Sequence, residues 1–329
     1  MFLGTTLIDD TFAEAFRMRY ARVIVTAHDE HWVKAAARES TGYGSSIIAC
    51  DAEAGIERYL SPDETPDGRP GASLMFFSFS PDAIGAALLK RIGQCVMTCP
   101  STAVYDGLPN AEDRVPLGKS LRYFGDGFQK SKQLDGQRYW RIPVMDGEFL
   151  CVEKVGVEKG IAGGNIIIQA DQLGDTLDAV RRAVEALQIM PNVITPFPGG
   201  AARSGSKVGS QYKTLKASTA DMFCPTLRGR VESRLHPDAN HACEIVIDGV
   251  DEASVAAAMA TAMRAAAGIE IAPQGASMQV SASSGTSQPK MHSATQRQTP
   301  AGMKILAISA GNYGGKLGKF HFHLRKVLG

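Results

Sequence analysis

The stretch LMFFSFSPDAIGAALLKRIGQCV (74–96) contains a strand and a helix joined by one tight turn. LMFFSFS (74–80) is apolar and aromatic, as a buried strand is. Ser80 is a good helix N-cap, and Pro81 suits the first helical position. The apolar residues that follow recur at helical spacing: Ile84, Leu88, Leu89, Ile92 and Val96. The stretch therefore predicts a strand that feeds an amphipathic helix, and the rest of the fold is built around that unit.

Similar elements flank this unit in the first half of the chain. ARVIVTA (21–27) and SSIIAC (45–50) are predicted strands, and residues 29–40 between them have helical character. A last strand is predicted near STAVYD (101–106). The resulting order is βαββαβ.

The second half repeats that order. The predicted strands are NIIIQA (165–170), VITPFP (193–198), CEIVIDGV (243–250) and MKILAISA (303–310). The predicted helices begin near Asp175 and cover residues 251–267. Two copies of a split βαβ motif indicate an α+β protein with two ferredoxin-like lobes. We place the lobes at residues 1–149 and 150–329.

Three insertions interrupt these lobes. Residues 107–150 are predicted to add β structure, through LRYFGDGF (121–128) and RYWRIPVM (138–145). Residues 199–240 form a polar, glycine-rich excursion. Residues 272–302 are rich in Ser, Gln, Ala and Pro, which predicts a low-complexity surface segment outside the active cleft, or a docking element for a partner subunit.

Composition excludes several classes of function. The chain has 329 residues with 44% hydrophobic and 21% charged residues and a formal net charge of +1. This balance gives no electrostatic reason to expect nucleic acid, and no apolar run reaches the ~20 residues of a membrane span. The six cysteines are scattered, and no export signal precedes them, so we expect a cytoplasmic protein with reduced thiols. Several strands are apolar on both faces, which favours lobe-on-lobe or subunit packing and hence a homo-oligomer.

Common cofactor and metal motifs fail on spacing. His28 and His31 lack further ligands, so exposed helix-start residues are favoured over a metal site. Cys95 and Cys99 suit small core residues better than a redox pair, and His321 and His323 suit a solvated basic tail better than an anion site. AGNYGGKLGK (310–319) lacks the spacing of a phosphate loop. We therefore expect no metal and no prosthetic group.

Four glycine-rich turns with polar side chains remain, all in the second half: GIAGGN (160–165), TPFPGG (195–200), SGSKVG (204–209) and AGNYGGKLGK (310–319). Such turns expose backbone N–H groups and let a large ligand approach the main chain. Lys207 and Lys316 could meet carboxylates or phosphates of that ligand. The alternative is a set of ordinary tight turns with surface lysines.

These residues carry a resemblance. ITPFPGG (194–200), SGSKVG (204–209) and AGNYGGKLGK (310–319) resemble signature stretches of the formylmethanofuran–tetrahydromethanopterin N-formyltransferase family. Further matches are EAGIERY (53–59), ETPDGRPG (64–71), IGQCV (92–96), STAVYDGLP (101–109), GIAGGN (160–165) and LKAST (215–219). The similarity covers nearly the whole chain, and the segment 272–302 is its clearest departure from the archaeal members.

The resemblance implies reversible formyl transfer in one-carbon metabolism. The donor would be the formylated amine of methanofuran or an analogue, the acceptor N5 of tetrahydromethanopterin, and the two would meet in a ternary complex. The family implies two ferredoxin-like lobes, no prosthetic group and a dimer or tetramer with its site at a cleft involving subunit contacts. Methylotrophic bacterial members belong to a formyltransferase/hydrolase complex, so hydrolase subunits are expected partners in formaldehyde oxidation.

The resemblance also points to particular residues. It implies Glu244 as the catalytic residue. Strand alternation predicts a partly buried, protonated carboxyl there, which suits an acid or a group that polarises the carbonyl. The residues that it implies for substrate binding are Asn165, Thr195, Phe197, Gly199, Gly200, Ser204, Ser206, Lys207, Asn312 and Lys316.

Three readings stay open from the sequence. A catalytic formyltransferase is favoured by the intact Glu244 and the glycine turns. The alternatives are a ferredoxin-like module that senses a small ligand at a subunit interface and a non-catalytic scaffold subunit of a formyl-hydrolysing complex. For Glu244 itself, a structural ion-pair carboxylate is the alternative role.

Overall fold

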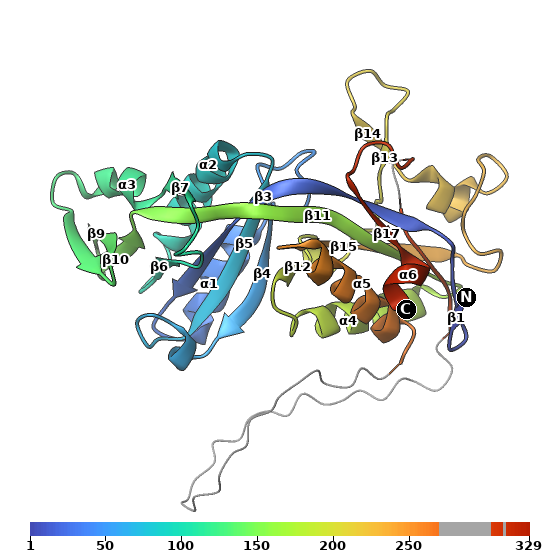
Figure 1. The fold of residues 1–329 in the computed structure, drawn as a ribbon, viewed down its shortest axis with the longest axis horizontal. Helices are drawn as coiled ribbons and strands as arrows, with labels where there is room; N and C mark the ends of the chain where they lie inside the picture. The colour runs from blue at the N-terminus through green and yellow to red at the C-terminus, as the bar shows by residue number, and fades with distance from the viewer. Residues whose placement is uncertain (270–303, 312–313) are drawn as a thin grey trace, which may run out of the picture.

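Two long antiparallel strands, β3 (Phe12–Thr26) and β11 (Lys154–Ala170), form the spine of the molecule. The computed structural model describes residues 1–269, 304–311 and 314–329. In it β3 and β11 lie side by side across its length, paired from Val157–Ala21 to Ala162–Phe16 (Figure 1). Both belong to one large mixed sheet. The chain therefore has a mixed α/β architecture in which the two halves share a continuous sheet.

The first half adds three strands and two helices to β3. β4 (Glu53–Leu60), β5 (Gly71–Ser78) and β6 (Ala103–Asp106) give the order β4-β5-β3-β6, with all neighbours antiparallel. α1 (Glu30–Thr41) and α2 (Pro81–Arg91), which continues into a π turn (Ile92–Val96), pack their apolar faces in one core with these strands. The Ser80 side chain accepts the Ala83 N–H, which confirms the predicted helix start.

The strand predicted at 45–50 is wrong. Those residues form bends and a turn, and the strand is β4, which begins at Glu53. Ile48 is exposed. Ile47 is partly buried and packs against a small apolar cluster at the junction of the two halves. Two adjacent isoleucines suggested a strand, but the hydrogen-bonded ladder begins only where β5 offers a partner.

The far end of the first half is formed by residues 113–152. Its strands are β7 (Asp113–Pro116), β8 (Lys130–Leu134), β9 (Gln137–Val144) and β10 (Gly147–Val152). The β structure predicted at 138–145 is confirmed. The β structure predicted at 121–128 is wrong, because that segment belongs to α3 (Gly118–Leu121) and a 3₁₀ turn (Arg122–Gly125). Its glycines and the left-handed Asp126 end a helical turn instead of continuing a strand.

The second half repeats the strand order around β11. α4 (Leu173–Leu187), β12 (Val193–Ile194), β15 (His241–Gly249), α5 (Glu252–Ala266) and β16 (Ile305–Ser309) give the order β12-β15-β11-β16, again antiparallel. The two chain ends join this half. β1 (Phe2–Leu3) and β2 (Thr6–Ile8) extend the sheet beyond β16, and β17 (Phe320–His323) pairs with β3 before the terminal α6 (Leu324–Leu328).

Residues 198–240 cover the face of this half opposite α4 and α5 (Figure 1). They contain the small sheet of β13 (Lys207–Val208) and β14 (Ala217–Ser218), and short 3₁₀ turns at Pro198–Gly200, Asp221–Phe223 and Pro225–Leu227. Phe223 and Leu235 pack there on Ile167 and Leu306. The cover that sequence reasoning assigned to another lobe or subunit is thus supplied partly by the chain itself. A short 3₁₀ turn, Pro62–Glu64, completes the described elements.

No helix among residues 1–269, 304–311 and 314–329 is both long and apolar enough to span a bilayer. The segment 272–302, predicted to lie on the surface, falls outside the described residues.

Candidate active site

Glu244 lies in the middle of β15, on the face that the excursion covers. Cys243, Ile245 and Ile247 pack into the core with α4 and α5. Strand alternation sends Glu244 and Asp248 to the opposite face. The pattern of this strand therefore determines that the carboxyl points away from the helices and toward residues 198–240.

Asn165 on the neighbouring strand holds the Glu244 carboxyl. Asn165 pairs with Val246 in the sheet, and its Nδ2 donates a hydrogen bond to Glu244 Oε1 at 2.5 Å. Its Oδ1 accepts the Gly311 N–H at 3.1 Å. The Asn165 side chain is buried, so both polar ends of the amide are fixed. The structure thus brings two of the predicted residues into direct contact.

Burial shifts the pKa of Glu244. It raises the pKa of the Glu244 carboxyl, and the hydrogen bond from Asn165 lowers it by a smaller amount. Desolvation disfavours the charged form of a carboxyl, because water no longer solvates the anion. The net direction is upward. Glu244 is therefore suited to hold a proton and release it to a bound molecule.

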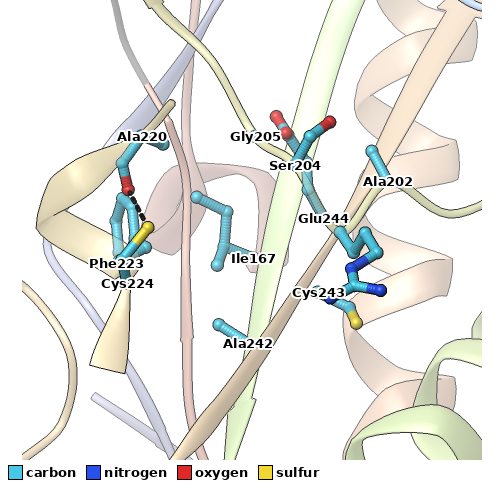
Figure 2. A pocket seen from close by; sticks show the side chains of 11 residues that line it. Ile167, Ala202, Ser204, Gly205, Ala220, Phe223, Cys224, Ala242, Cys243 and Glu244 are labelled. Atoms are coloured by element: carbon cyan, nitrogen blue, oxygen red, sulfur yellow. Dashed lines mark hydrogen bonds between the residues drawn. The ribbon is translucent and has the colours of Figure 1, made fainter. Parts of the chain in front are cut away.

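A small cavity opens beside Glu244 (Figure 2). Its volume is about 40 Å³, which at roughly 10–15 Å³ per water-sized group leaves room for about three such groups and not for a whole coenzyme. Apolar side chains and a carboxyl meet there, and the wall consists of Ile167, Ala202, Arg203, Ser204, Gly205, Ala220, Phe223, Cys224, Ala242, Cys243 and Glu244.

Gly205 keeps the mouth of this cavity open. Its φ is +49°, in the left-handed region. A Cβ at this position would lie 3.0 Å from the Ala220 Cβ and 3.7 Å from Glu244 Oε2. Oε2 is the oxygen that Asn165 does not hold, so a side chain on residue 205 would close over the free end of the carboxyl.

The segment from Thr195 to Ala202 runs along the edge of β15. Ile194 pairs with Asp248, and Ala202 exchanges two backbone hydrogen bonds with Glu244, at 2.8 and 2.9 Å. Between them, Pro198–Gly200 form a 3₁₀ turn in which Gly199 and Gly200 have φ of +63° and +78°. Thr195, Phe197 and these two glycines therefore border the site at the sheet edge, but they do not line the small cavity.

The next predicted residues lie on the excursion. Ser204 lines the cavity, and Ser206 is exposed beside it. Lys207 forms an ion pair with Asp221. That pair fastens β13 to the 3₁₀ turn that carries Phe223, so Lys207 helps to hold the cavity wall and does not present a free charge in this structure.

The glycine-rich loop near the C-terminus is held by a buried acid. Glu14 of β3 is 1% exposed, and its carboxylate accepts the N–H groups of Gly315, Leu317 and Gly318 at 2.8, 2.5 and 2.5 Å. These backbone donors, expected to face a ligand, are thus used inside the chain. Lys316 remains exposed on this loop. Asn312 lies outside the described residues.

Sequence reasoning missed the apolar wall of the cavity. Ile167, Ala220, Phe223, Cys224 and Ala242 belong to segments that are far apart in the chain. One signal was present: Asn165, Ile167 and Gln169 alternate on one face of a predicted strand, and Gln169 Oε1 accepts the His236 N–H at 2.7 Å. A glutamine on the same strand face as Asn165 is a sign that a polar segment covers that face. Only the fold shows that the covering segment is residues 198–240.

Within the part of the chain that the structure describes, no three His, Cys, Asp or Glu side chains gather as metal ligands. Cys95 and Cys99 are partly buried, and burial raises the pKa of both thiols.

Known proteins resemble this chain over its whole length. A family model described as formylmethanofuran-tetrahydromethanopterin formyltransferase matches residues 1–144. A second, described as FTR, proximal lobe, matches residues 147–286 and 283–327. The formylmethanofuran–tetrahydromethanopterin formyltransferase of Methylococcus capsulatus is 50% identical over 328 residues, which cover 100% of both chains.

Solved structures agree. The formylmethanofuran:tetrahydromethanopterin formyltransferase of Methanosarcina barkeri has a TM-score of 0.85 at 41% identity, covering 99% of this chain and 100% of that one. A chain in the structure of the formyltransferase/hydrolase complex of Methylorubrum extorquens with methylofuran has a TM-score of 0.85 at 44% identity, covering 98% and 96%.

Proposed function

Because the chain belongs to the formylmethanofuran–tetrahydromethanopterin formyltransferase family, we propose that Glu244 is the acid of its formyl transfer. The protein is a formyltransferase that moves a formyl group between a methanofuran-type carrier and tetrahydromethanopterin. The observation that carries the assignment of Glu244 is its environment. Asn165 holds one oxygen of the carboxyl, and the other oxygen lies beside Gly205 in the wall of a small cavity.

The proposed step is an acyl transfer in a ternary complex. N5 of the pterin attacks the formamide carbon, the C–N5 bond forms, and a tetrahedral oxyanion develops. The C–N bond to the methanofuran amine then breaks. Glu244 gives its proton to the departing amine and recovers one from N5, so protons balance over the cycle. Proximity of the two carriers supplies much of the acceleration.

The other assigned residues surround the two carriers in this proposal. Ser204 and Ser206 offer hydroxyls at the cavity mouth, and Lys316 offers a charge to an acidic carrier tail. The border residues Thr195, Phe197, Gly199 and Gly200 would contact the larger parts of the carriers. Lys207 could reach such a tail only by leaving Asp221.

The finer organisation also belongs to the proposal. We describe the halves, 1–149 and 150–329, as two ferredoxin-like lobes, which the repeated antiparallel order β4-β5-β3-β6 and β12-β15-β11-β16 supports. The enzyme would work in the cytoplasm as a homo-oligomer without a prosthetic group. The Methylorubrum complex supports hydrolase subunits as partners and a methanofuran analogue as carrier.

The variant Glu244→Gln tests the role of the acid. Glutamine keeps the shape and the hydrogen bond, but it cannot deliver a proton. We expect kcat to fall by ~10²–10⁴-fold, the range for loss of an essential acid, with an unchanged melting temperature. Purified enzyme is mixed with the formylated carrier and tetrahydromethanopterin, and the pterin absorbance is followed.

Glu232→Gln is the matched control, since Glu232 is an exposed acid on the same excursion. It should leave kcat unchanged. An undiminished kcat in Glu244→Gln would remove Glu244 from the chemistry and favour a structural role for its carboxyl.

A further inference from the structure

Asp248 is a second buried acid on the strand of Glu244. It lies four residues further along β15 and on the same face, and it is 0% exposed. It does not line the cavity beside Glu244. Burial removes the hydration of a carboxyl, so a fully buried acid lowers the stability of the fold unless hydrogen bonds compensate for the lost water.

Asp248 is bonded to an irregularity in β11. Its Oδ1 accepts the Gly163 N–H at 3.0 Å. Gly163 has a φ of +99°, and the register between β11 and β15 shifts between Ile161 and Gly164. This is a β-bulge, in which one strand carries an extra residue opposite its partner. Asp248 thus holds the bulge from the opposite strand.

The bulge decides which way Asn165 points. Ile161, Ile166 and Ile168 all pack into the core with α4 and α5. Residues 161 and 166 differ by an odd number, so a regular strand would send them to opposite faces. The extra residue restores the phase, and Asn165 consequently faces away from the helices toward Glu244. Without the bulge, the asparagine would point into the apolar core.

Glu53 of β4 lies next to Asp248. Glu53 is 7% exposed, its carboxyl accepts the Ile47 N–H at 3.0 Å, and its charge acts on Asp248. Asp248 Oδ2 has no hydrogen-bond partner among the described residues, and two carboxyls can share a hydrogen bond only when one of them is protonated. Burial raises the pKa of both groups, and the charge of Glu53 raises that of Asp248 further. The pair therefore places one acid from each half of the molecule together at a buried position, where the upward pKa shifts favour the protonated form.

We propose that Asp248 is a positioning residue for formyl transfer: it fixes the bulge of β11 that aims the Asn165 amide at Glu244. Glu53 supports Asp248 from the other half of the molecule. The inference rests on the proposed role of Glu244, since the orientation of Asn165 matters for turnover only if Glu244 reacts.

Three variants separate positioning from general stability. Asp248→Ala removes the acceptor of the Gly163 N–H. Asp248→Asn keeps an acceptor for Gly163 and a donor for Glu53. Glu53→Ala breaks the same carboxyl pair but leaves the bond from Gly163 to Asp248. kcat, the KM for each carrier and the melting temperature are measured for all three, with formylmethanofuran and tetrahydromethanopterin as substrates.

We expect Asp248→Ala to lower kcat at least 10-fold while both KM values change less than 3-fold. Asp248→Asn should restore kcat to within 3-fold of the parent. Glu53→Ala should lower the melting temperature, yet keep kcat within 3-fold. If Asp248→Ala does not fold, Asp248→Ser replaces it, because its hydroxyl keeps a polar group at the buried position but is one atom shorter than the carboxyl that accepts the Gly163 N–H.

The proposal is overturned if Asp248→Ala and Glu53→Ala lower kcat equally, because both would then act through the lobe junction alone. It is also overturned if Asp248→Asn loses as much activity as Asp248→Ala. These outcomes differ from failure of the proposed function, in which Glu244→Gln itself keeps full kcat.

Discussion

Replacing Asn165 by alanine tests the central contact of the site. The change removes the donor at 2.5 Å from Glu244 Oε1 and the acceptor of the Gly311 N–H at 3.1 Å. A hydrogen bond between neutral groups, such as the Asn165 amide and a protonated Glu244, contributes about 0.5–1.5 kcal/mol. At about 1.4 kcal/mol per factor of ten, the expected loss of kcat/KM is about 2- to 13-fold. The unpaired Gly311 N–H should also lower stability.

The pH dependence gives the reaction-specific readout. Burial raises the pKa of Glu244, and the Asn165 bond is the influence that lowers it. Without that bond the pKa rises further. An acid that must be protonated then stays active to higher pH, so the alkaline limb of the rate profile moves upward. A carboxyl with a raised pKa in the folded state stabilises the fold at low pH, and this contribution is lost as the pH rises to the folded pKa. In the variant, whose folded pKa is higher, the loss therefore extends to higher pH than in the parent.

The assay is steady-state transfer followed through the pterin absorbance across the pH range. Gln172→Ala is the matched control, because its exposed amide donates to Asp171 at 2.7 Å and neither residue lines the cavity. It should change neither rate nor profile. The reasoning is refuted if Asn165→Ala keeps full kcat/KM, or if its alkaline limb moves to lower pH.

Two further perturbations address the walls of the site. Glu14→Gln leaves one acceptor oxygen for the backbone donors of residues 315–318 and places an NH₂ among them, so the free energy of unfolding should fall by about 1–3 kcal/mol in urea titrations; an unchanged value would mean that another contact holds the loop. Gly205→Val should close over Glu244 Oε2 and lower kcat/KM by about 10-fold or more. Gly209→Val is its control, since Gly209 also has positive φ, at +87°, but has open space around it; equal losses in the two variants would point to backbone strain instead of obstruction.

Much of the scaffold was predictable because its signals are local. The start of α2 at Ser80 and Pro81 depends on a side chain that bonds its own helix. Apolar periodicity located α4, and the helix propensity of an alanine-rich segment located α5. The site was predictable only in part. Residue alternation suggested a half-buried Glu244, but its choice among the acids came from a family resemblance.

Long-range partners account for what was missed. β3 begins at Phe12, although the predicted strand began nine residues later, because Glu14 and the charges after it suggest an exposed segment. Residues 315–318, from the far end of the chain, supply three N–H donors to the buried Glu14 carboxylate. The residues around Glu14 give no sign of this contact with residues 315–318, so the sequence pattern could not predict its burial.

The sequence by itself determined the βαββαβ order of each half and the face of β15 on which Glu244 lies, since both follow largely from side-chain spacing of two or 3.6 residues. The tertiary structure decided what that carboxyl meets. A one-residue bulge turns Asn165 toward it, and the excursion folds back to leave a cavity of about 40 Å³. These features depend on contacts between segments separated by tens to hundreds of residues. Packing of the whole chain selects them, and the spacing of neighbouring residues does not encode them.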